Sequence, residues 1–371
     1  MNKLAKRIIL ISVVLSIIGL YQVYSSSKIW AEYKENDQFF YLKRQFLFMI
    51  VGYIALFVFS KIDLNKIFRL NRYGIIISFL LLILVLIPGL SIVRNGSRSW
   101  FAIGGFAFQP SEFAKLSLIL FTSSYLSYNY KKSDNFLKTT FIILLVGGLF
   151  FFLIMLQPDL GSGLVILSTL LLMTFTSRSK IRHYFILGSV ALIAFSFLII
   201  SEPYRLNRIS AYLDPFSDPL GSGFQIIQSI YALSPGGLIG EGIDGSIQKH
   251  FYLPEPQTDF IYAIFCEEWG FIGGILLLGL FSVFINTGLQ IAKNINDLEK
   301  SYLAIGVVGV ISIQVVINLA VVVGLIPVTG ITLPFISYGG SSLVVTLALT
   351  GLLINVAKEE NKNENHFSSI R

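Results

Sequence analysis

The chain is poor in charged residues. They make up 13% of its 371 residues, whereas 54% are hydrophobic and 14% are aromatic. A soluble domain carries roughly 25% charged residues, and the mean hydropathy here is +0.74. This composition excludes an ordinary soluble globular protein, a disordered chain and a nucleic-acid-binding domain. The net charge of +7 then has a topological meaning, because Lys and Arg set the orientation of membrane helices.

Residues that bind metals or form disulfides are scarce. The single cysteine, Cys266, excludes an internal disulfide framework and a cysteine-based zinc site. The histidines His183, His250 and His366 lie far apart in the sequence, which argues against a histidine metal site. The Walker A lysine motif, the dinucleotide glycine fingerprint and the Gly-x-Ser-x-Gly elbow are also missing. We therefore expect no nucleotide cofactor, no ATP-driven motor and no serine hydrolase.

Long apolar runs fill most of the chain. A bilayer core about 30 Å thick needs about 17 to 25 apolar residues per helix. We interpret the first run as a retained helix, because no small-residue cleavage site follows it. The runs predict an all-α, polytopic integral membrane protein with ten transmembrane helices: Ile8–Tyr24, Phe46–Ser60, Tyr73–Ile87, Phe113–Tyr128, Thr139–Leu156, Leu160–Thr176, Tyr184–Ile200, Phe260–Ile291, Leu303–Gly324 and Ser341–Val356.

The segments between these runs predict the orientation. With the N-terminus in the cytoplasm, the inner segments hold most Lys and Arg residues, and most Asp and Glu residues fall outside. The positive-inside rule then places both termini in the cytoplasm, in agreement with an even number of helices. Residues 201–260 become a large extracytoplasmic loop between helices 7 and 8, and residues 357–371 a short cytoplasmic tail. We expect one membrane domain over residues 1–371.

Glycine and proline concentrate in three of the predicted outer segments, residues 88–115, 201–260 and 325–341. Irregular backbone at membrane depth is tolerated only where it is buried in protein or lines a wet cavity. Most of the acidic residues share this side of the membrane. We therefore expect any functional site on the extracytoplasmic face.

Two short motifs begin helices on this face. In residues 109–115 a proline starts the helix, and Glu112 and Lys115 are three positions apart, so they can pair on one helix face. In residues 157–161 a tight turn lets Asp159 cap the next helix. Each motif has a structural interpretation, an ion pair or a cap, and a functional one, a charge that faces a cavity.

A basic, aromatic and acidic stretch precedes the eighth predicted helix and ends at Asp259. This residue is either an N-cap or a general base at the membrane surface. Arg208 and Lys249 could hold an anionic phosphate group. Glu267 and Glu268 point about 100° apart on the helix, so at least one faces the bundle interior. Such an acid either couples to protons in a transporter or forms a buried structural pair.

Together these motifs resemble the SEDS family (shape, elongation, division and sporulation), whose members polymerise peptidoglycan glycan strands from lipid II. The resemblance covers nearly the whole chain. Residues 88–100, 225–229 and 248–259 are more similar to the FtsW and SpoVE branch than to RodA. The family motifs are Asn95–Trp100, Gln109–Lys115, Gln157–Gly161, Leu253–Phe260, Glu267–Glu268 and Leu333–Ser342, of which the last reads as a broken or re-entrant element, or as a simple helix-entry loop.

The resemblance implies an inverting glycosyltransferase in the bacterial cytoplasmic membrane, enriched at the division septum. A glycan on undecaprenyl pyrophosphate would be the donor and the 4-hydroxyl of lipid II the acceptor. Asp259 matches the family's essential loop acid. The leaving group needs cations, from the side chains or from a divalent metal, Mg or Mn. The implied partners are a class B penicillin-binding transpeptidase and other divisome proteins.

Other functions stay open beside a septal polymerase. An elongation or sporulation paralogue stays open as an alternative, as do a lipid II flippase or other transporter and a scaffold that only activates its transpeptidase. A transporter needs polar groups along a path to the inner face, and the inner half of the predicted helices is nearly uncharged.

We expect substrate contacts from Arg94, Arg98, Trp100, Lys115, Arg208 and Lys249, and structural support from Gln109, Glu112, Asp159, Glu267, Glu268 and Ser337.

Overall fold

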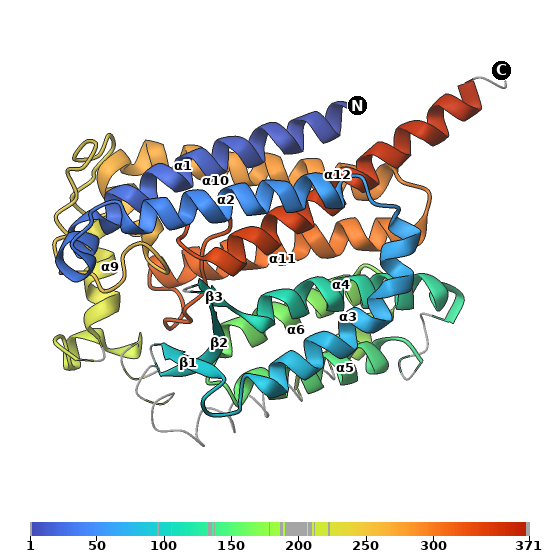
Figure 1. The fold of residues 1–371 in the computed structure, drawn as a ribbon, viewed down its shortest axis with the longest axis horizontal. Helices are drawn as coiled ribbons and strands as arrows, with labels where there is room; N and C mark the ends of the chain where they lie inside the picture. Colours follow the sequence, from blue (N-terminus) through green and yellow to red (C-terminus); the bar gives the residue numbers. More distant parts are fainter. Residues whose placement is uncertain are drawn as a thin grey trace.

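The protein is a bundle of helices that run lengthwise through the molecule (Figure 1). Helices α1, α2, α10, α11 and α12 lie on one side of it, and α3 to α6 lie on the other. The computed structural model describes residues 2–94, 96–104, 106–132, 136, 138–177, 179–185, 188–189, 206, 210, 212–221 and 223–368.

The helices are bounded as follows: α1 Lys3–Glu35, α2 Phe40–Phe59, α3 Leu64–Leu84, α4 Pro110–Tyr128, α5 Thr140–Met155, α6 Leu160–Phe175, α9 Phe224–Leu233, α10 Ile261–Asn294, α11 Leu298–Val322 and α12 Gly340–Ser368, with single 3-10 turns at Tyr130–Lys132 and Pro215–Ser217. Within the described residues, 6 helices are long and apolar enough to cross a membrane: α1, α2, α3, α10, α11 and the first part of α12. Helices α5, α6 and α9 are apolar but shorter. The predicted run Tyr184–Ile200 falls almost wholly outside the described residues.

Polar side chains fix several helix ends. Asn2 accepts a hydrogen bond from the backbone of Leu4 at the start of α1, and Asp63 caps α3 in the same way. Helix α1 continues to Glu35, well past the predicted end at Tyr24. Its last turns contain Ser25, Ser26 and Ser27, which are buried against the rest of the protein. Hydropathy underestimates this helix because its final buried face is polar.

A small antiparallel sheet interrupts the helical pattern between α3 and α4, so the all-α expectation was wrong for this segment. Strands β1 (Ser91–Arg94), β2 (Ser97–Ile103) and β3 (Phe106–Phe108) pair in the order β1-β2-β3. The turns between them pass through Gly96 and Gly104, both with positive φ, which glycine adopts at no steric cost. A sheet of this size packs on the helices and needs no apolar run of its own.

Helix α10 is broken near its start. Gly270 has φ 67° and ψ −171°, a conformation essentially restricted to glycine. The segment 236–242 enters the break: the backbone N–H of Phe271 donates to Gly237 (2.9 Å), and that of Glu241 donates to Glu267 (2.9 Å). These bonds satisfy backbone groups that the break releases. The sequence predicted one continuous run here, Phe260–Ile291, and missed the break.

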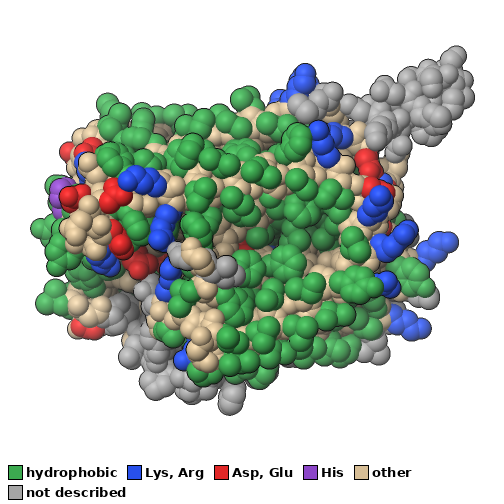
Figure 2. All heavy atoms as spheres, viewed as in Figure 1, with side chains coloured by type: hydrophobic (Ala, Val, Ile, Leu, Met, Phe, Trp, Pro, Cys, Tyr) green, Lys and Arg blue, Asp and Glu red, His purple; other side chains and the backbone are tan. Residues whose placement is uncertain are grey.

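The two ends of the bundle differ. Both chain termini lie at one end (Figure 1). Figure 2 shows a broad band of hydrophobic side chains between two charged ends, with Lys and Arg prevailing near the termini and more Asp and Glu at the opposite end. That opposite end carries residues 85–109, 156–159, 234–260 and 323–339, and we refer to it as the loop end.

Candidate active site

Asp259 lies at the loop end, directly before α10. The side-chain amide of Asn318 on α11 donates to the carbonyl oxygens of Asp259 (2.8 Å) and Ile331 (2.7 Å), which ties the two loops together. A Cβ placed on Gly330 would sit 3.7 Å from Oδ2 of Asp259, so the carboxylate borders the Gly330 turn. The N-cap residue of α10 is Phe260. The N-cap interpretation of Asp259 was therefore wrong.

The segment 333–338 fixes the backbone around Asp259. The Ser337 hydroxyl accepts from the backbone N–H of Leu333 (2.8 Å) and donates to the carbonyl of Thr258 (2.7 Å). The N–H of Tyr338 donates to the carbonyl of Gln257 (2.8 Å). Consecutive carbonyls from Gln257 to Asp259 are thus each held from another element, which leaves this loop little freedom to move.

The turn before α6 borders residues 329–331, which precede the segment 333–338. The carboxylate of Asp159 accepts from the backbone of Ser162 (3.0 Å), as the cap interpretation expects, and from the side chain of Gln109 (3.0 Å). A Cβ on Gly161 would come within 2.5 Å of the Thr329 carbonyl, so only glycine lets these two segments touch. The residues Asp159 and Asp259 therefore flank one short segment, residues 329–331.

The sheet brings three predicted substrate-binding residues to the loop end. Gln157 receives hydrogen bonds on its carbonyl from the Ser97 hydroxyl (2.5 Å) and the Arg98 backbone (3.2 Å), which anchors the sheet on the turn before α6. Arg94 is exposed, and Arg98 and Trp100 are half-buried. Arg208, another predicted substrate-binding residue, lies outside the described residues.

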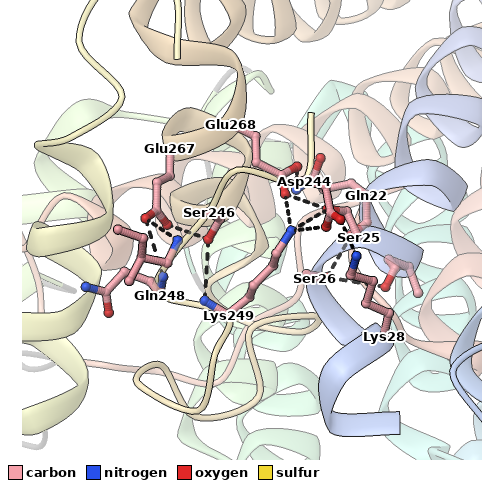
Figure 3. A network of polar contacts seen from close by, with 12 residues as sticks. Gln22, Ser25, Ser26, Lys28, Asp244, Ser246, Gln248, Lys249, Glu267 and Glu268 are labelled. Carbon is pink, nitrogen blue, oxygen red and sulfur yellow. Dashed lines mark hydrogen bonds and ion pairs between the residues drawn. The ribbon is translucent and has the colours of Figure 1, made fainter. Parts of the chain in front are cut away.

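Lys249 does not point into open space. Its ammonium group pairs with Glu268 (2.9 Å) and with Asp244, and the lysine is 1% exposed (Figure 3). Asp244 also pairs with Lys28 at the end of α1. Burial raises the pKa of Asp244, but the hydrogen bonds and charges of Lys249 and Lys28 outweigh it, so the pKa lies below its ordinary value. The network joins α1, the loop and α10.

The two predicted helix acids are both occupied. Glu268 also accepts a hydrogen bond from Gln22 on α1 (3.3 Å). Glu267 accepts from the Ser246 hydroxyl (2.5 Å) and the backbone N–H of Ile247 (2.8 Å), as Figure 3 shows. The structure therefore places both acids as buried groups that hold the loop against α10, in line with the structural interpretation of this pair.

Lys115 is likewise buried and paired. Its ammonium group lies 2.7 Å from Glu112, and their side chains are 3% and 7% exposed. Lys115 lines a small cavity with residues of α6 and α11, including Thr169 and Val310. Two of the predicted substrate-binding cations, Lys115 and Lys249, thus have carboxylate partners inside the protein.

Arg44 is a site residue that the sequence analysis missed. It lies at the loop end of α2 and stacks over the Phe40 ring at 4.3 Å. The only signal in the sequence was an arginine next to an apolar run, which is typical of an ordinary helix end.

In the part of the chain that the structure describes, no three His, Cys, Asp or Glu side chains gather to hold a metal ion.

An apolar helical bundle with irregular, acid-bearing loops at one end defines a polytopic membrane protein with its polar site near one membrane surface. The model of the FtsW/RodA/SpoVE family of cell cycle proteins matches residues 5–362, and the chain belongs to this family. Stage V sporulation protein E of Bacillus subtilis strain 168 is 51% identical over 351 residues, which cover 95% of this chain and 96% of that protein. The resemblance expected from the motifs is confirmed.

Other relatives agree with this assignment. A probable peptidoglycan glycosyltransferase FtsW of Geobacter sp. strain M18 is 37% identical over 350 residues, which cover 94% of this chain and 95% of that protein. A chain of a peptidoglycan synthase complex, solved to describe its coordination of polymerization and crosslinking, superposes with a TM-score of 0.79 at 32% identity over 95% of this chain and 97% of its own. RodA of Thermus thermophilus superposes with a TM-score of 0.68 at 28% identity, covering 95% and 96%.

Proposed function

We propose that the protein is an inverting peptidoglycan glycosyltransferase that polymerises lipid II at the outer face of the bacterial cytoplasmic membrane. The observation that carries this proposal is Asp259, a carboxylate on a backbone held from several elements at the loop end. Relatives that match over nearly their full length are described as probable peptidoglycan glycosyltransferases. A rigid carboxylate at a membrane surface suits chemistry on a lipid-linked sugar.

The proposed topology has ten transmembrane helices, cytoplasmic termini and one membrane domain over residues 1–371. The loop end then faces outward, with residues 201–260 as the catalytic loop and residues 357–371 as the cytoplasmic tail. The position of both termini at the more cationic end supports this orientation (Figure 2).

In the proposed reaction Asp259 accepts the proton of the lipid II 4-hydroxyl as its oxygen attacks the anomeric carbon of the donor. The bond from that carbon to the pyrophosphate oxygen breaks, and undecaprenyl pyrophosphate leaves with the electron pair. Attack from the opposite face inverts the configuration. The leaving group carries its own activation, so the step needs no nucleotide. Arg94, Arg98 and Arg208 are proposed cations for the pyrophosphate, with Trp100 beside them.

A divalent cation, Mg or Mn, stays a prediction for this protein. The described residues offer no cluster of three His, Cys, Asp or Glu side chains that could hold such an ion. A cation that arrives with the pyrophosphate would act on the leaving group itself.

The proposed partners are a class B penicillin-binding transpeptidase, which would crosslink the product, and other divisome proteins. The superposed chain from a complex that couples polymerization to crosslinking supports such a partner. Enrichment at the division septum is part of the same proposal. The 51% identity to a sporulation protein favours a sporulation paralogue as the second candidate role. An elongation role is supported by the likeness to RodA of Thermus thermophilus. Lipid II transport has less support, since the buried ion pairs of Lys115 and Lys249 lie toward the loop end.

The direct test is polymerisation of labelled lipid II by the purified full-length protein with its cognate transpeptidase. We expect Asp259→Asn to lower the rate by about 100-fold or more, because a positioned general base contributes roughly 10²–10⁴-fold. The amide keeps the size of the side chain but cannot take the proton.

Asp37→Asn is the matched control. Asp37 is a surface acid between α1 and α2 that pairs with Lys43, and such pairs contribute at most about 1 kcal/mol. We expect near wild-type polymer from this variant. Equal polymer from Asp259→Asn would remove Asp259 as the base, and no polymer from the wild type would favour the flippase or scaffold alternatives.

A further inference from the structure

Asn318 is a buried polar residue on an otherwise apolar face of α11. It is 1% exposed, and three apolar residues on the same side of the helix are also buried: Ile311, Val315 and Val322. Helix α11 is long and apolar enough to cross a membrane, where a polar side chain needs a partner inside the protein. The sequence analysis assigned Asn318 no role, since one amide in an apolar run forms no recognisable motif.

The amino group of Asn318 makes hydrogen bonds to two different loops. It donates to the carbonyl of Asp259 (2.8 Å) and to that of Ile331 (2.7 Å). Both acceptors are carbonyl oxygens, so the amino group of the amide must face them, and its oxygen points elsewhere. That oxygen has no hydrogen-bond partner among the described residues. The contribution of this side chain therefore lies in its two donors.

These two bonds fix the backbone of Asp259 relative to the Gly330 turn. Gly330 borders the Asp259 carboxylate, directly precedes Ile331 and has a positive φ of 77°. The carbonyl that Asn318 holds belongs to Asp259 itself, so a shift of this carbonyl also turns the carboxylate. Ile331 and Phe260 are 6% and 2% exposed, and a buried carbonyl that loses its donor is costly because water does not replace it.

Asn318 differs in origin from the other groups that hold this loop. The carbonyls of Gln257 and Thr258 accept from the segment 333–338, which is itself a loop. Asn318 instead lies on a long helix that packs against α4, α6 and α10. Side chains on helices place a site more precisely than side chains on loops. Asn318 thus aligns Asp259 with the helical bundle.

We propose that Asn318 is a positioning residue for the reaction, and that its amino group aims the Asp259 carboxylate at the sugar hydroxyl. The inference rests on the proposed function of Asp259 and adds the helix residue that aligns it. Asn318 is buried beneath the loop and acts through Asp259 without touching the substrate. A displacement of a reacting group by about 1 Å can cost about 100-fold in rate.

Asn318→Asp keeps the shape of the side chain but replaces the two-donor amino group by an acceptor. Polymerisation of labelled lipid II by the purified full-length protein with its cognate transpeptidase gives kcat and KM, and equilibrium binding of labelled lipid II is measured separately. We expect kcat to fall by about 100-fold, with KM and binding within about three-fold of the wild type. Asn318→Ser keeps one donor and should lose about ten-fold in kcat; it replaces Asn318→Asp if that variant does not fold.

Asn355→Asp is the matched control. Asn355 on α12 is 7% exposed, and its amino group likewise donates to two carbonyls, those of Phe59 (2.8 Å) and Ile62 (2.6 Å), at the end that carries the termini. Each variant loses two buried hydrogen bonds, so we expect similar decreases in thermal stability. Only folded Asn318→Asp should lose kcat. An equal loss of kcat in both folded variants would make Asn318 a structural residue and overturn the inference.

A double variant tests whether Asn318 acts through Asp259. Asp259→Asn/Asn318→Asp should be no slower than Asp259→Asn alone, because residues that act as a unit have non-additive effects. A further fall of about 100-fold in the double variant would overturn the inference, as would wild-type kcat in folded Asn318→Asp. An inactive wild type would instead contradict the proposed function, so the two failures are distinguishable.

Discussion

Lys249 is a predicted substrate-binding residue whose contacts instead stabilise the fold. It is 1% exposed, and its two acid partners come from the loop and from α10. Removing one member of a buried ion pair leaves an uncompensated charge and costs about 3–5 kcal/mol. We expect Lys249→Met to lower the free energy of unfolding by about this amount, measured by denaturation in detergent. The double variant Lys249→Met/Glu268→Gln should recover part of the loss, since no buried carboxylate remains at that position.

Lys43→Met serves as the control for this prediction. Its partner Asp37 is at the surface, and exposed pairs contribute about 0–1 kcal/mol. A similar loss in both single variants would mean that methionine itself is poorly tolerated near this end. No recovery in the double variant would show that Glu268 is held by its other donors, Gln22 and Ser25, independently of the lysine.

At the scale of elements, the break in α10 is the feature on which the loop end depends. A Cβ on Gly270 would lie 2.4 Å from the backbone nitrogen of Gly240, and its φ is +67°. We expect Gly270→Ala to destabilise the protein by about 1–3 kcal/mol from backbone strain alone, with the clash in addition. Thermal unfolding of the purified protein measures the effect.

Gly279→Ala is the matched control on the same helix. Nothing lies within 4 Å of a Cβ at Gly279, and alanine is favoured over glycine in a helix interior by about 1 kcal/mol. This variant should be as stable as the wild type or more so. If Gly270→Ala behaved in the same way, the inserted segment 236–242 would have to be free to move away from the helix.

The sequence predicted the elements where composition alone decides them. The runs that became α1, α2, α3 and the last three helices stand out by hydropathy, because their lipid-facing side chains are apolar. The sheet at residues 91–108 and the extension of α1 to Glu35 were missed. Both are stabilised by contacts with other segments, such as the Ser97 bond to Gln157. Hydropathy averaged over a short stretch of sequence does not depend on partners that are distant in the chain.

The candidate site was predictable in part for the same reason. Motif order singled out Asp259, Ser337 and Asp159, and the structure places all three at the loop end: Ser337 is part of the segment 329–338, and the two acids lie next to it. Pairing within one motif, as between Glu112 and Lys115, follows from helix spacing. The hydrogen bond from Gln45 to the Ser337 carbonyl does not, because these residues are 292 positions apart and only the tertiary fold brings them together.

At the scale of the whole molecule, function depends on which end faces outward. The buried charges, the broken helix and the glycine turns all belong to the loop end, whereas the opposite end carries the termini and a surface rich in Lys and Arg. Lys358 there hydrogen-bonds the carbonyl of Ser60 (3.0 Å) and closes α12 onto the end of α2. Polymerisation outside the cell requires the loop end on the outer face of the membrane. The orientation of the protein is therefore a prediction that can be tested separately from the role of any single residue.

Cysteine labelling in spheroplasts measures this orientation. Cys266 is buried at 8% exposure, and Cys266→Ala gives a background without cysteine. On that background Leu220→Cys in the 201–260 loop and Tyr128→Cys at the far end of α4 replace side chains that are 88% and 89% exposed. A membrane-impermeant maleimide should label the first variant in intact spheroplasts and the second only after permeabilisation. The reverse pattern would place Asp259 in the cytoplasm, away from the growing wall, and labelling of both would contradict an α4 that crosses the bilayer.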